Sequence, residues 1–289
     1  SRIWFERHTL ARRGVLASGP KRAAMPKRTG SFSAPPAKRT RGDGRSESSE
    51  LSVEQYRERL SKQGKFVDRK PGTGSQDGCL LDPPRLPPVV KVLDKKAAEP
   101  KRGPDGCFVF ADHPSFKPNL SPKEVLQLGS FGGTYFRDIV SAVTGQAHKG
   151  TEVAGEFPRS WFEGLDMASV VCSSAYDKQI NQYKVSCGGS LGQWECSGWI
   201  SALDPYGWFH WYCRFFLGRR STDDERQIDR WQKGQGPTGR WRIRLCNDII
   251  KKKGTYDDVK VSPVLRQVLQ HWAYRLTEAD LDAQRKRKR

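Results

Sequence analysis

The sequence lacks any run approaching the ~20 apolar residues that a membrane-spanning helix needs, so we expect no membrane partner. No segment recurs with a period of roughly 20–50 residues, which argues against a solenoid or a propeller. Apolar residues make up only 36% of the 289 positions, which is low for a chain that folds from end to end. We therefore expect one packed domain attached to long segments that have no core of their own.

The motifs of several enzyme classes are also missing. There is no GxxxxGK[ST] phosphate loop, no GxGxxG turn between a strand and a helix, and no HExxH helix, so NTPases, dinucleotide enzymes and zinc peptidases have no support. No CxxC pair occurs, which removes the usual ligand spacing of zinc fingers. We expect no cofactor. The seven cysteines are odd in number and follow no visible secretory leader, which favours reduced thiols in the nucleus or cytosol.

Basic residues are plentiful but unevenly placed. The chain holds 51 Lys and Arg against 32 Asp and Glu, a net charge of +19. Residues 1–103 carry 24 basic and 11 acidic side chains, and residues 281–289 carry five and one, whereas residues 104–280 carry 22 and 20. A polyanion such as DNA or RNA would therefore meet the two ends of the chain first.

The first hundred residues have the composition of a tail. Residues 1–24 hold five Arg, one Lys and a single acid, which fits either a targeting segment or translation upstream of a start at Met25. Residues 25–103 are rich in Pro, Ser and charge, and such segments bury too little apolar surface to offset ~1–2 kcal/mol of backbone entropy per residue. We expect a disordered basic tail over 25–103, a folded domain over 104–280 and a second basic tail over 281–289.

Each expected tail carries a basic cluster. The first comprises Lys38, Arg39 and Arg41, and the second comprises Arg285, Lys286, Arg287, Lys288 and Arg289. Such clusters are typical of nuclear localisation signals and of nucleic-acid patches. They predict a protein of the nucleus whose partners include nuclear import receptors.

The expected domain is mainly α, with α+β as the alternative. Serine or threonine caps, Ser-Pro starts and glycine stops predict helices over 122–128, over 134–143, from 191 to a stop near Gly198, over 222–232 and over 240–253, and one that begins at Ser262-Pro263. Thr222 is expected to cap the fourth of these. The first six residues of 240–253 also alternate like a strand. Residues 208–216 are apolar or aromatic except for His210 and Arg214, so their length suits a buried strand as well as a helix. We favour the helix, because the segments after it have helical spacing.

Several long motifs stand out in this domain. They are GSFGGTYF at 129–136, EFPRSWFEG at 156–164, GWFHWYCRFFLGRR at 207–220 with DDERQIDRW after it, and LQHWAY at 269–274. They resemble an uncharacterised family of eukaryotic proteins over residues 120–276. The resemblance implies one domain after a variable tail. It implies no activity and assigns no functional residue.

Arginines alternate with aromatic residues through the last third of the domain. Guanidinium groups bind phosphates bidentately, and aromatic faces stack on bases. The pattern predicts a nucleic-acid-binding face, either for DNA or for RNA, formed by Arg214, Arg219, Arg220, Arg226, Arg230 and Arg240. The alternative is an internal lattice, in which these arginines stack on the same aromatic rings and pair with Asp223, Asp224, Glu225 and Asp229.

Two other functions remain open, and with them whether the protein is an enzyme. One is a metal-dependent enzyme that modifies or hydrolyses nucleic acid, and the other is a protein–protein interaction domain. Acids in the first turn of a helix are far more often caps than metal ligands. The enzyme alternative has three candidate groups: zinc on His210, Cys213, Cys246 and His271; a Cys213 nucleophile beside either histidine; or catalytic or magnesium-binding acids among Asp204, Asp223, Asp224 and Glu225.

Overall fold

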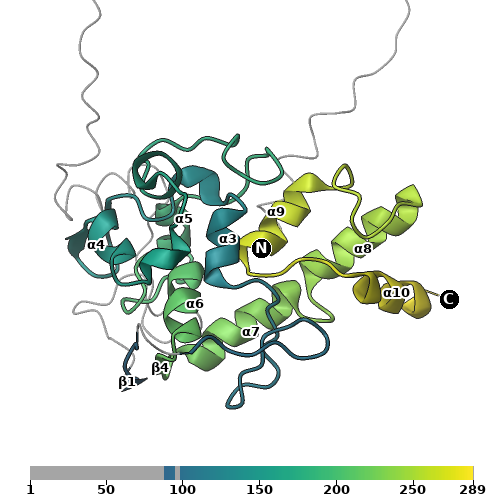
Figure 1. Ribbon diagram of the computed structural model, residues 1–289, viewed down its shortest axis with the longest axis horizontal. Helices are drawn as coiled ribbons and strands as arrows, with labels where there is room; N and C mark the ends of the chain where they lie inside the picture. Colours follow the sequence, from purple (N-terminus) through teal and green to yellow (C-terminus); the bar gives the residue numbers. More distant parts are fainter. Residues whose placement is uncertain (1–87, 95–97, 289) are drawn as a thin grey trace, which may run out of the picture. The chain divides into compact units, whose positions relative to one another are not determined.

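The structure is a computed structural model, and it describes residues 88–94 and 98–288. Residues 1–24, most of the expected tail over 25–103 and the basic cluster at 38–41 lie outside the described residues. The described part is mainly helical, as predicted (Figure 1). Its strands form two small antiparallel pairs. Within this part of the chain, every helix is too short or too polar to cross a membrane.

The first half of the domain consists of short elements joined by tight turns. Helix α3 (Pro122–Gln127) begins at a capping box, in which Ser121 Oγ accepts the N–H of Glu124 and the Glu124 carboxylate accepts the N–H of Ser121. The elements after it are η1 (Phe131–Gly133), β2 (Ile139–Ser141), β3 (Gln146–His148), α4 (Gly150–Ala154), η2 (Arg159–Trp161), η3 (Met167–Val171) and α5 (Leu191–Cys196).

Longer helices make up the second half. They are α6 (Trp208–Phe216), α7 (Asp224–Gln235), α8 (Arg240–Lys252), α9 (Pro263–His271) and α10 (Glu278–Arg287). Helix α7 packs against α6 and α8, and α8 packs against α9 and α10 (Figure 1). The helix favoured for 208–216 is confirmed, so the alternative of a buried strand is wrong.

The core is aromatic and is built around α6. Trp211, Tyr212 and Phe215 have no exposed surface, and Phe116, from the loop before α3, packs edge-on against Tyr212 and Phe215. Trp231 of α7 closes the same cluster from the other side of Phe116. Aromatic pairs of this kind contribute about 0.5–1.5 kcal/mol each beyond the burial of their surface. Helix α6 is therefore held in place by its aromatic contacts, and the polar residues at its two ends, Asp204 and Arg219, are positioned by it.

The helix predicted over 134–143 is wrong. Ile139–Ser141 form β2, which pairs with β3 in a hairpin whose turn contains Gly145 at φ +70°. The N–H of Ala142 is taken by the carboxylate of Glu195, which has no exposed surface. Partners far away in the sequence therefore satisfy backbone groups that a helix would have paired locally.

The boundary predicted at residue 280 is also wrong. Residues 281–287 are not a separate tail, because they continue α10, which begins at a capping box formed by Thr277 and Asp280. Leu281 is only 1% exposed, so this helix is anchored by an apolar contact. The run of basic residues at the end of the chain gave no sign of that anchor.

The folded part also begins before residue 104. Strand β1 (Val89–Lys91) pairs antiparallel with β4 (Arg220–Ser221), which follows α6. Phe108 and Phe110 are both 4% exposed and pack against Phe216. The segment before α3 thus covers the end of α6 that carries the predicted arginines.

Candidate nucleic-acid interface

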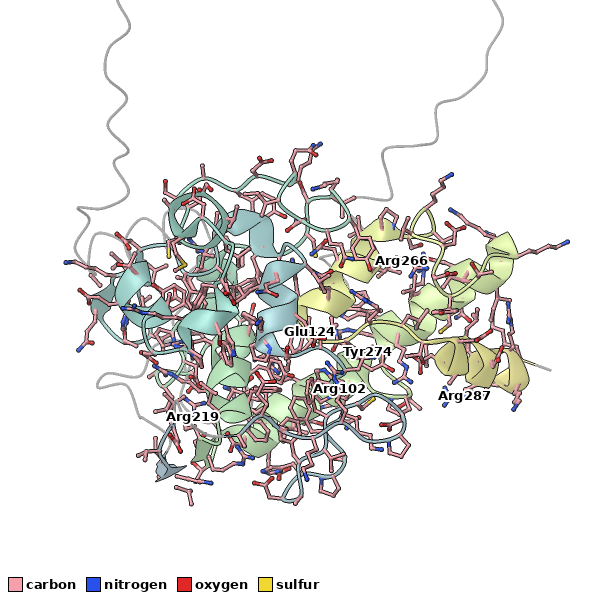
Figure 2. The ribbon with its side chains drawn as sticks, viewed as in Figure 1. Arg102, Glu124, Arg219, Arg266, Tyr274 and Arg287 are labelled. Carbon is pink, nitrogen blue, oxygen red and sulfur yellow. The ribbon has the colours of Figure 1, made fainter. Side chains whose placement is uncertain are left out.

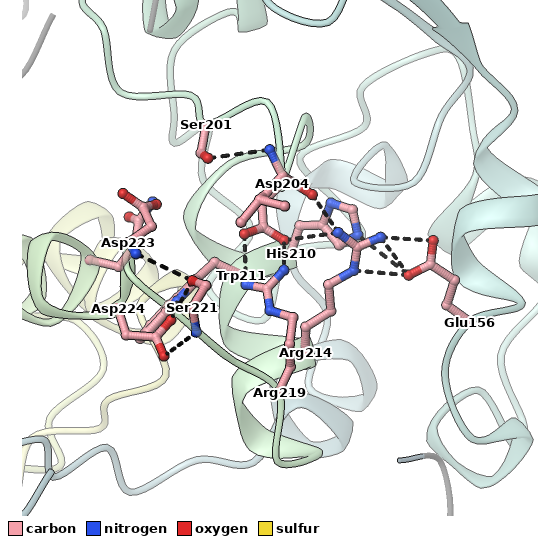
Figure 3. A network of polar contacts seen from close by, with 12 residues as sticks. Glu156, Ser201, Asp204, His210, Trp211, Arg214, Arg219, Ser221, Asp223 and Asp224 are labelled. Atoms are coloured by element: carbon pink, nitrogen blue, oxygen red, sulfur yellow. Dashed lines mark hydrogen bonds and ion pairs between the residues drawn. The ribbon is translucent and has the colours of Figure 1, made fainter. Parts of the chain in front are cut away.

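A buried carboxylate organises the arginines at the ends of α6. Asp204 lies in the turn before α6 and has no exposed surface. Arg219, just after α6, donates from Nη1 and Nη2 to the two oxygens of Asp204, each at 2.7 Å. Arg214, on α6, donates from Nη1 to Oδ1 of Asp204 at 3.0 Å (Figure 3). Burial alone would raise the pKa of Asp204, but the two guanidinium groups outweigh it and lower the pKa, so Asp204 is ionised.

Arg214 continues the network to Glu156. Its Nε and Nη2 donate to the two oxygens of Glu156 at 2.6–2.9 Å (Figure 3). Burial raises the pKa of Glu156, but His210 and Arg214 together lower it from 4.5 to about 2. The network therefore runs from a buried carboxylate to a partly exposed one through a single guanidinium group.

His210 lies beside this network and approaches it at Glu156. It has no exposed surface, and its Nε2 is 3.9 Å from Oε2 of Glu156, which is too far for a hydrogen bond. Neither ring nitrogen has a hydrogen-bond partner among the described residues. Burial lowers the pKa of His210 to about 4, so the ring is neutral at pH 7. It packs edge-on against Phe136 and Phe157 as an aromatic core residue.

Two further arginines are paired in the same way. Arg220 donates from Nε to Asp112 at 2.6 Å, and its guanidinium carbon lies 3.8 Å from the centre of the Phe215 ring. Arg226 donates from Nη2 to Asp223 at 2.9 Å. These pairs form an internal lattice, in which only Arg226 has one of the expected acids, Asp223, as its partner. Arg214, Arg219 and Arg220 pair with Glu156, Asp204 and Asp112 instead. Arg219 is 4% exposed, so it does not line an exposed face. For Arg214, Arg220 and Arg226 the nucleic-acid role stays a prediction.

Arg230, on α7, has a different environment. Its Nη1 donates to the carbonyl of Trp199 at 3.0 Å and to Oε1 of Gln227 at 2.8 Å. Its guanidinium carbon lies 5.7 Å from the ring centre of Trp199 and 5.4 Å from that of Trp272. No ion pair of Arg230 occurs within the described ranges. Burial, with a smaller effect of Arg226, lowers the pKa of Arg230 to about 9, so it stays cationic at neutral pH.

The remaining predicted arginine lies at a second place, where α8 begins and α10 ends. Arg240 is exposed, and its guanidinium carbon lies 4.8 Å from the ring centre of Trp241. Arg287, near the end of α10 (Figure 2), donates to the carbonyl of Pro237 at 3.0 Å, and Pro237 lies three residues before the start of α8. We name this surface the basic end; its residues are Arg240, Arg285, Lys286, Arg287 and Lys288, all exposed. Arg289 of the predicted cluster lies outside the described residues.

The acids proposed as magnesium ligands serve the fold instead. Asp224 is 2% exposed, and it accepts the indole N–H of Trp211 and both the N–H and the hydroxyl of Ser221. Asp223, rather than Thr222, stands at the N-terminus of α7, so the predicted threonine cap is wrong. Across residues 88–94 and 98–288, no three His, Cys, Asp or Glu side chains come together as metal ligands. The zinc set and the magnesium set are therefore not assembled.

The structure also brings together a cysteine and a histidine that the sequence analysis did not connect. Sγ of Cys187 lies 3.7 Å from Nδ1 of His271, although the two residues are 84 positions apart. Nε2 of His271 accepts the backbone N–H of Phe131 at 2.9 Å, so Nδ1 carries the proton and cannot take one from the thiol. Burial raises the pKa of Cys187 to about 12. Cys213 is fully buried, and burial raises the pKa of its thiol far above the ordinary range. Neither cysteine has the setting of a nucleophile.

Sequence reasoning missed Trp199 as the partner of Arg230. It lies in a loop just after Gly198, where neither helical nor strand spacing links it to α7. No protein-family model, no curated protein and no solved structure matches the chain. The motif resemblance over residues 120–276 therefore stays a prediction.

Proposed function

We propose that the protein binds nucleic acid through the basic end. The observation that carries the proposal is that the hydrogen bond from Arg287 to the carbonyl of Pro237 brings the basic last turn of α10 to the loop before α8, whose first residue is the exposed Arg240. In the described part of the chain, the acid paired with this group is Asp282, which bonds Arg285 at 3.0 Å. Most of the charge on this surface is therefore free to meet phosphates, in contrast to the arginines around α6.

The sequence favours this arrangement at each level. Leu281 anchors α10 to the domain, and the basic residues follow it in the last turn, where cations are favoured by the helix dipole. The same helix begins with Glu278 and Asp280, so positive charge is gathered at one end of it. A surface of this kind, on a rigid helix, binds the phosphate backbone without reading the sequence of bases.

The test is the salt dependence of DNA binding by the full chain. On duplex DNA, each phosphate that a protein binds contributes ~0.9 to the slope of log K against log salt. The double variant Lys286→Gln/Lys288→Gln should therefore lower the slope by up to ~1.8, with an unchanged melting temperature. Arg287 is left intact because it also bonds Pro237.

A matched control removes the same charge elsewhere. Lys251 and Lys252 are exposed at the opposite end of α8, about 17 Å from Arg240 along the helix axis. The variant Lys251→Gln/Lys252→Gln should leave the slope nearly unchanged. If both double variants change the slope equally, or if neither does, the basic end is not the binding surface.

We also propose that the protein is imported into the nucleus through the same run of α10 together with Lys38, Arg39 and Arg41. Residues 285–288 are exposed, so an import receptor has access to them. A deletion of residues 281–289 would remove the buried Leu281, so the test uses substitutions. Neutralising Lys286, Lys288 and the first cluster should move a tagged protein to the cytoplasm. Undiminished nuclear fluorescence would contradict this part of the proposal.

A further inference from the structure

The guanidinium group of Arg230 contacts two tryptophan rings, those of Trp199 and Trp272. The guanidinium carbon of Arg230 lies 5.7 Å from the ring centre of Trp199 and 5.4 Å from that of Trp272. Trp199 is 36% exposed, so part of its side chain is open to solvent. The outer part of this ring therefore meets solvent while its inner part contacts a cation.

The loop that carries Trp199 is held in place before any ligand arrives. The N–H of Trp199 donates to the carbonyl of Trp194 at 3.0 Å, and its own carbonyl accepts from Arg230. Arg226, one turn before Arg230 on α7, reaches the neighbouring carbonyl of Gly198 at 3.5 Å. A ring fixed in this way loses little conformational freedom on binding.

The charge of Arg230 has no matching carboxylate among the described residues. Arg214, Arg219, Arg220 and Arg226 each form an ion pair, whereas Arg230 bonds only to the neutral oxygens of Trp199 and Gln227. Its Nε and Nη2 have no acceptor within the described ranges. A partly buried guanidinium group with two free donor positions is suited to an anion such as a phosphate.

We propose that Trp199 and Arg230 form a site for one unpaired nucleotide, with the base stacked on the indole of Trp199 and its phosphate bound by Arg230. The inference rests on the proposed function and narrows its substrate class to single-stranded nucleic acid. In a duplex each base is already stacked between its neighbours, so its face is closed to Trp199. A single strand presents that face without the cost of unstacking.

The test measures the anisotropy of a labelled oligothymidylate of about 12 nucleotides, and of a duplex of equal length, with the full chain. Trp199→Ala should weaken binding of the single strand about 5- to 150-fold, which is the usual effect of removing one base–aromatic stack. It should change duplex binding by less than about twofold. Trp199→Phe keeps a ring and should retain most of the affinity, whereas Arg230→Gln should weaken the single strand and lower its salt slope by ~0.7.

Two controls separate the site from general effects. Val264→Ala shortens another apolar side chain that is also 36% exposed, and Arg159→Gln removes an exposed cation on a different element. Both should leave single-strand binding nearly unchanged. The melting temperature of each variant is measured as well. It shows whether the contact of Arg230 with Trp199 serves only to hold the loop that carries Trp199.

The inference is overturned if Trp199→Ala behaves like Val264→Ala, or if the unaltered protein prefers the duplex. If Trp199→Ala unfolds, the variants Trp199→Phe and Arg230→Gln decide. An unchanged affinity of Arg230→Gln for the single strand would show that the contact of Arg230 with the two tryptophans is purely structural. The proposed function fails by a different result. In that case the variant Lys286→Gln/Lys288→Gln binds both the single strand and the duplex as the unaltered protein does. Loss of both probes in the lysine variant, with no effect of Trp199→Ala, removes only the single-strand site.

Discussion

Removing the charge of Asp204 tests the physical role of the arginine lattice. Asp204→Asn keeps the shape of the side chain but leaves Arg219 without a carboxylate and Arg214 with only Glu156. Arg219 is 4% exposed, so water cannot replace the missing carboxylate. Leaving one member of a buried ion pair uncompensated costs about 3–5 kcal/mol of the free energy of unfolding. For a domain of this size that corresponds to a fall in melting temperature of roughly 6–20 °C.

The assay is urea unfolding of the full chain at neutral pH, followed by tryptophan fluorescence. Asp112→Asn is the matched control, because Asp112 pairs with Arg220 in the same way while its side chain is 50% exposed. Exposed pairs contribute about 0–1 kcal/mol, so this variant should unfold almost as the unaltered protein does. The difference between the two variants measures the effect of burial on the same substitution.

A double variant separates pairing from burial. Asp204→Leu with Arg219→Met replaces both charges with apolar groups, and such replacements of a buried pair are often neutral or stabilising. It should therefore be more stable than Asp204→Asn, although Arg214 keeps only Glu156 as its partner. If Asp204→Asn costs no more than Asp112→Asn, the buried pair does not stabilise the fold, which would refute this reasoning.

Two further predictions concern stability. Glu156 has its pKa lowered from 4.5 to about 2 in the folded protein, so its contribution to the free energy of unfolding is present above about pH 4.5 and is lost as the pH falls towards 2. Calorimetry of Glu156→Gln should therefore show a lower stability at pH 6 and a flatter decline of stability between pH 5 and 3. A decline as steep as that of the unaltered protein would contradict the assignment. Leu281→Ala should lower the free energy of unfolding in urea by about 2–5 kcal/mol, because Leu281 is 1% exposed. Asp282→Ala removes an exposed pair with Arg285 and should lower it by less than ~1 kcal/mol. Equal costs would mean that α10 is not anchored by Leu281.

The sequence predicts most helices of this domain because their ends carry local signals. The Ser-Pro start at 121–122 sets up a capping box, and the glycines at 129 and 198 follow helices closely. The turn before α6 is evident from Asp204-Pro205-Tyr206-Gly207, and Gly207 closes it with a 2.8 Å bond to Asp204. These signals act within a few residues, so a single sequence is enough to detect them.

The errors occur where distant residues decide the local structure. Residues 139–141 have helical spacing of apolar side chains, yet they pair as a strand because the buried carboxylate of Glu195 holds the chain just after them. The end of the chain has the composition of a tail, yet Leu281 anchors it in a helix. In both cases the deciding contact is with another segment, and no spacing within the element itself reports it.

The arginine pattern shows the same limit for function. Arginine, aromatic and acidic residues are the materials both of a phosphate-binding face and of an internal lattice, so their alternation leaves the two open. The burial of Asp204 decides for the lattice at Arg214 and Arg219. The cluster at 285–288 is recognisable from composition, but its position beside Arg240 depends on the packing of α10 against α8.

The two kinds of arginine lead to opposite experimental signatures. A change at Asp204 or Arg219 should alter the free energy of unfolding and leave the salt slope of binding intact, because those charges do not reach solvent. A change at Lys286 or Lys288 should alter the salt slope and leave unfolding intact, because both side chains are exposed. Helices α7 and α8 connect the lattice to the basic end, so a variant that changed both quantities would mean that binding depends on the packing of these two helices. Measuring both quantities on each variant therefore tests the lattice and the binding surface independently of each other.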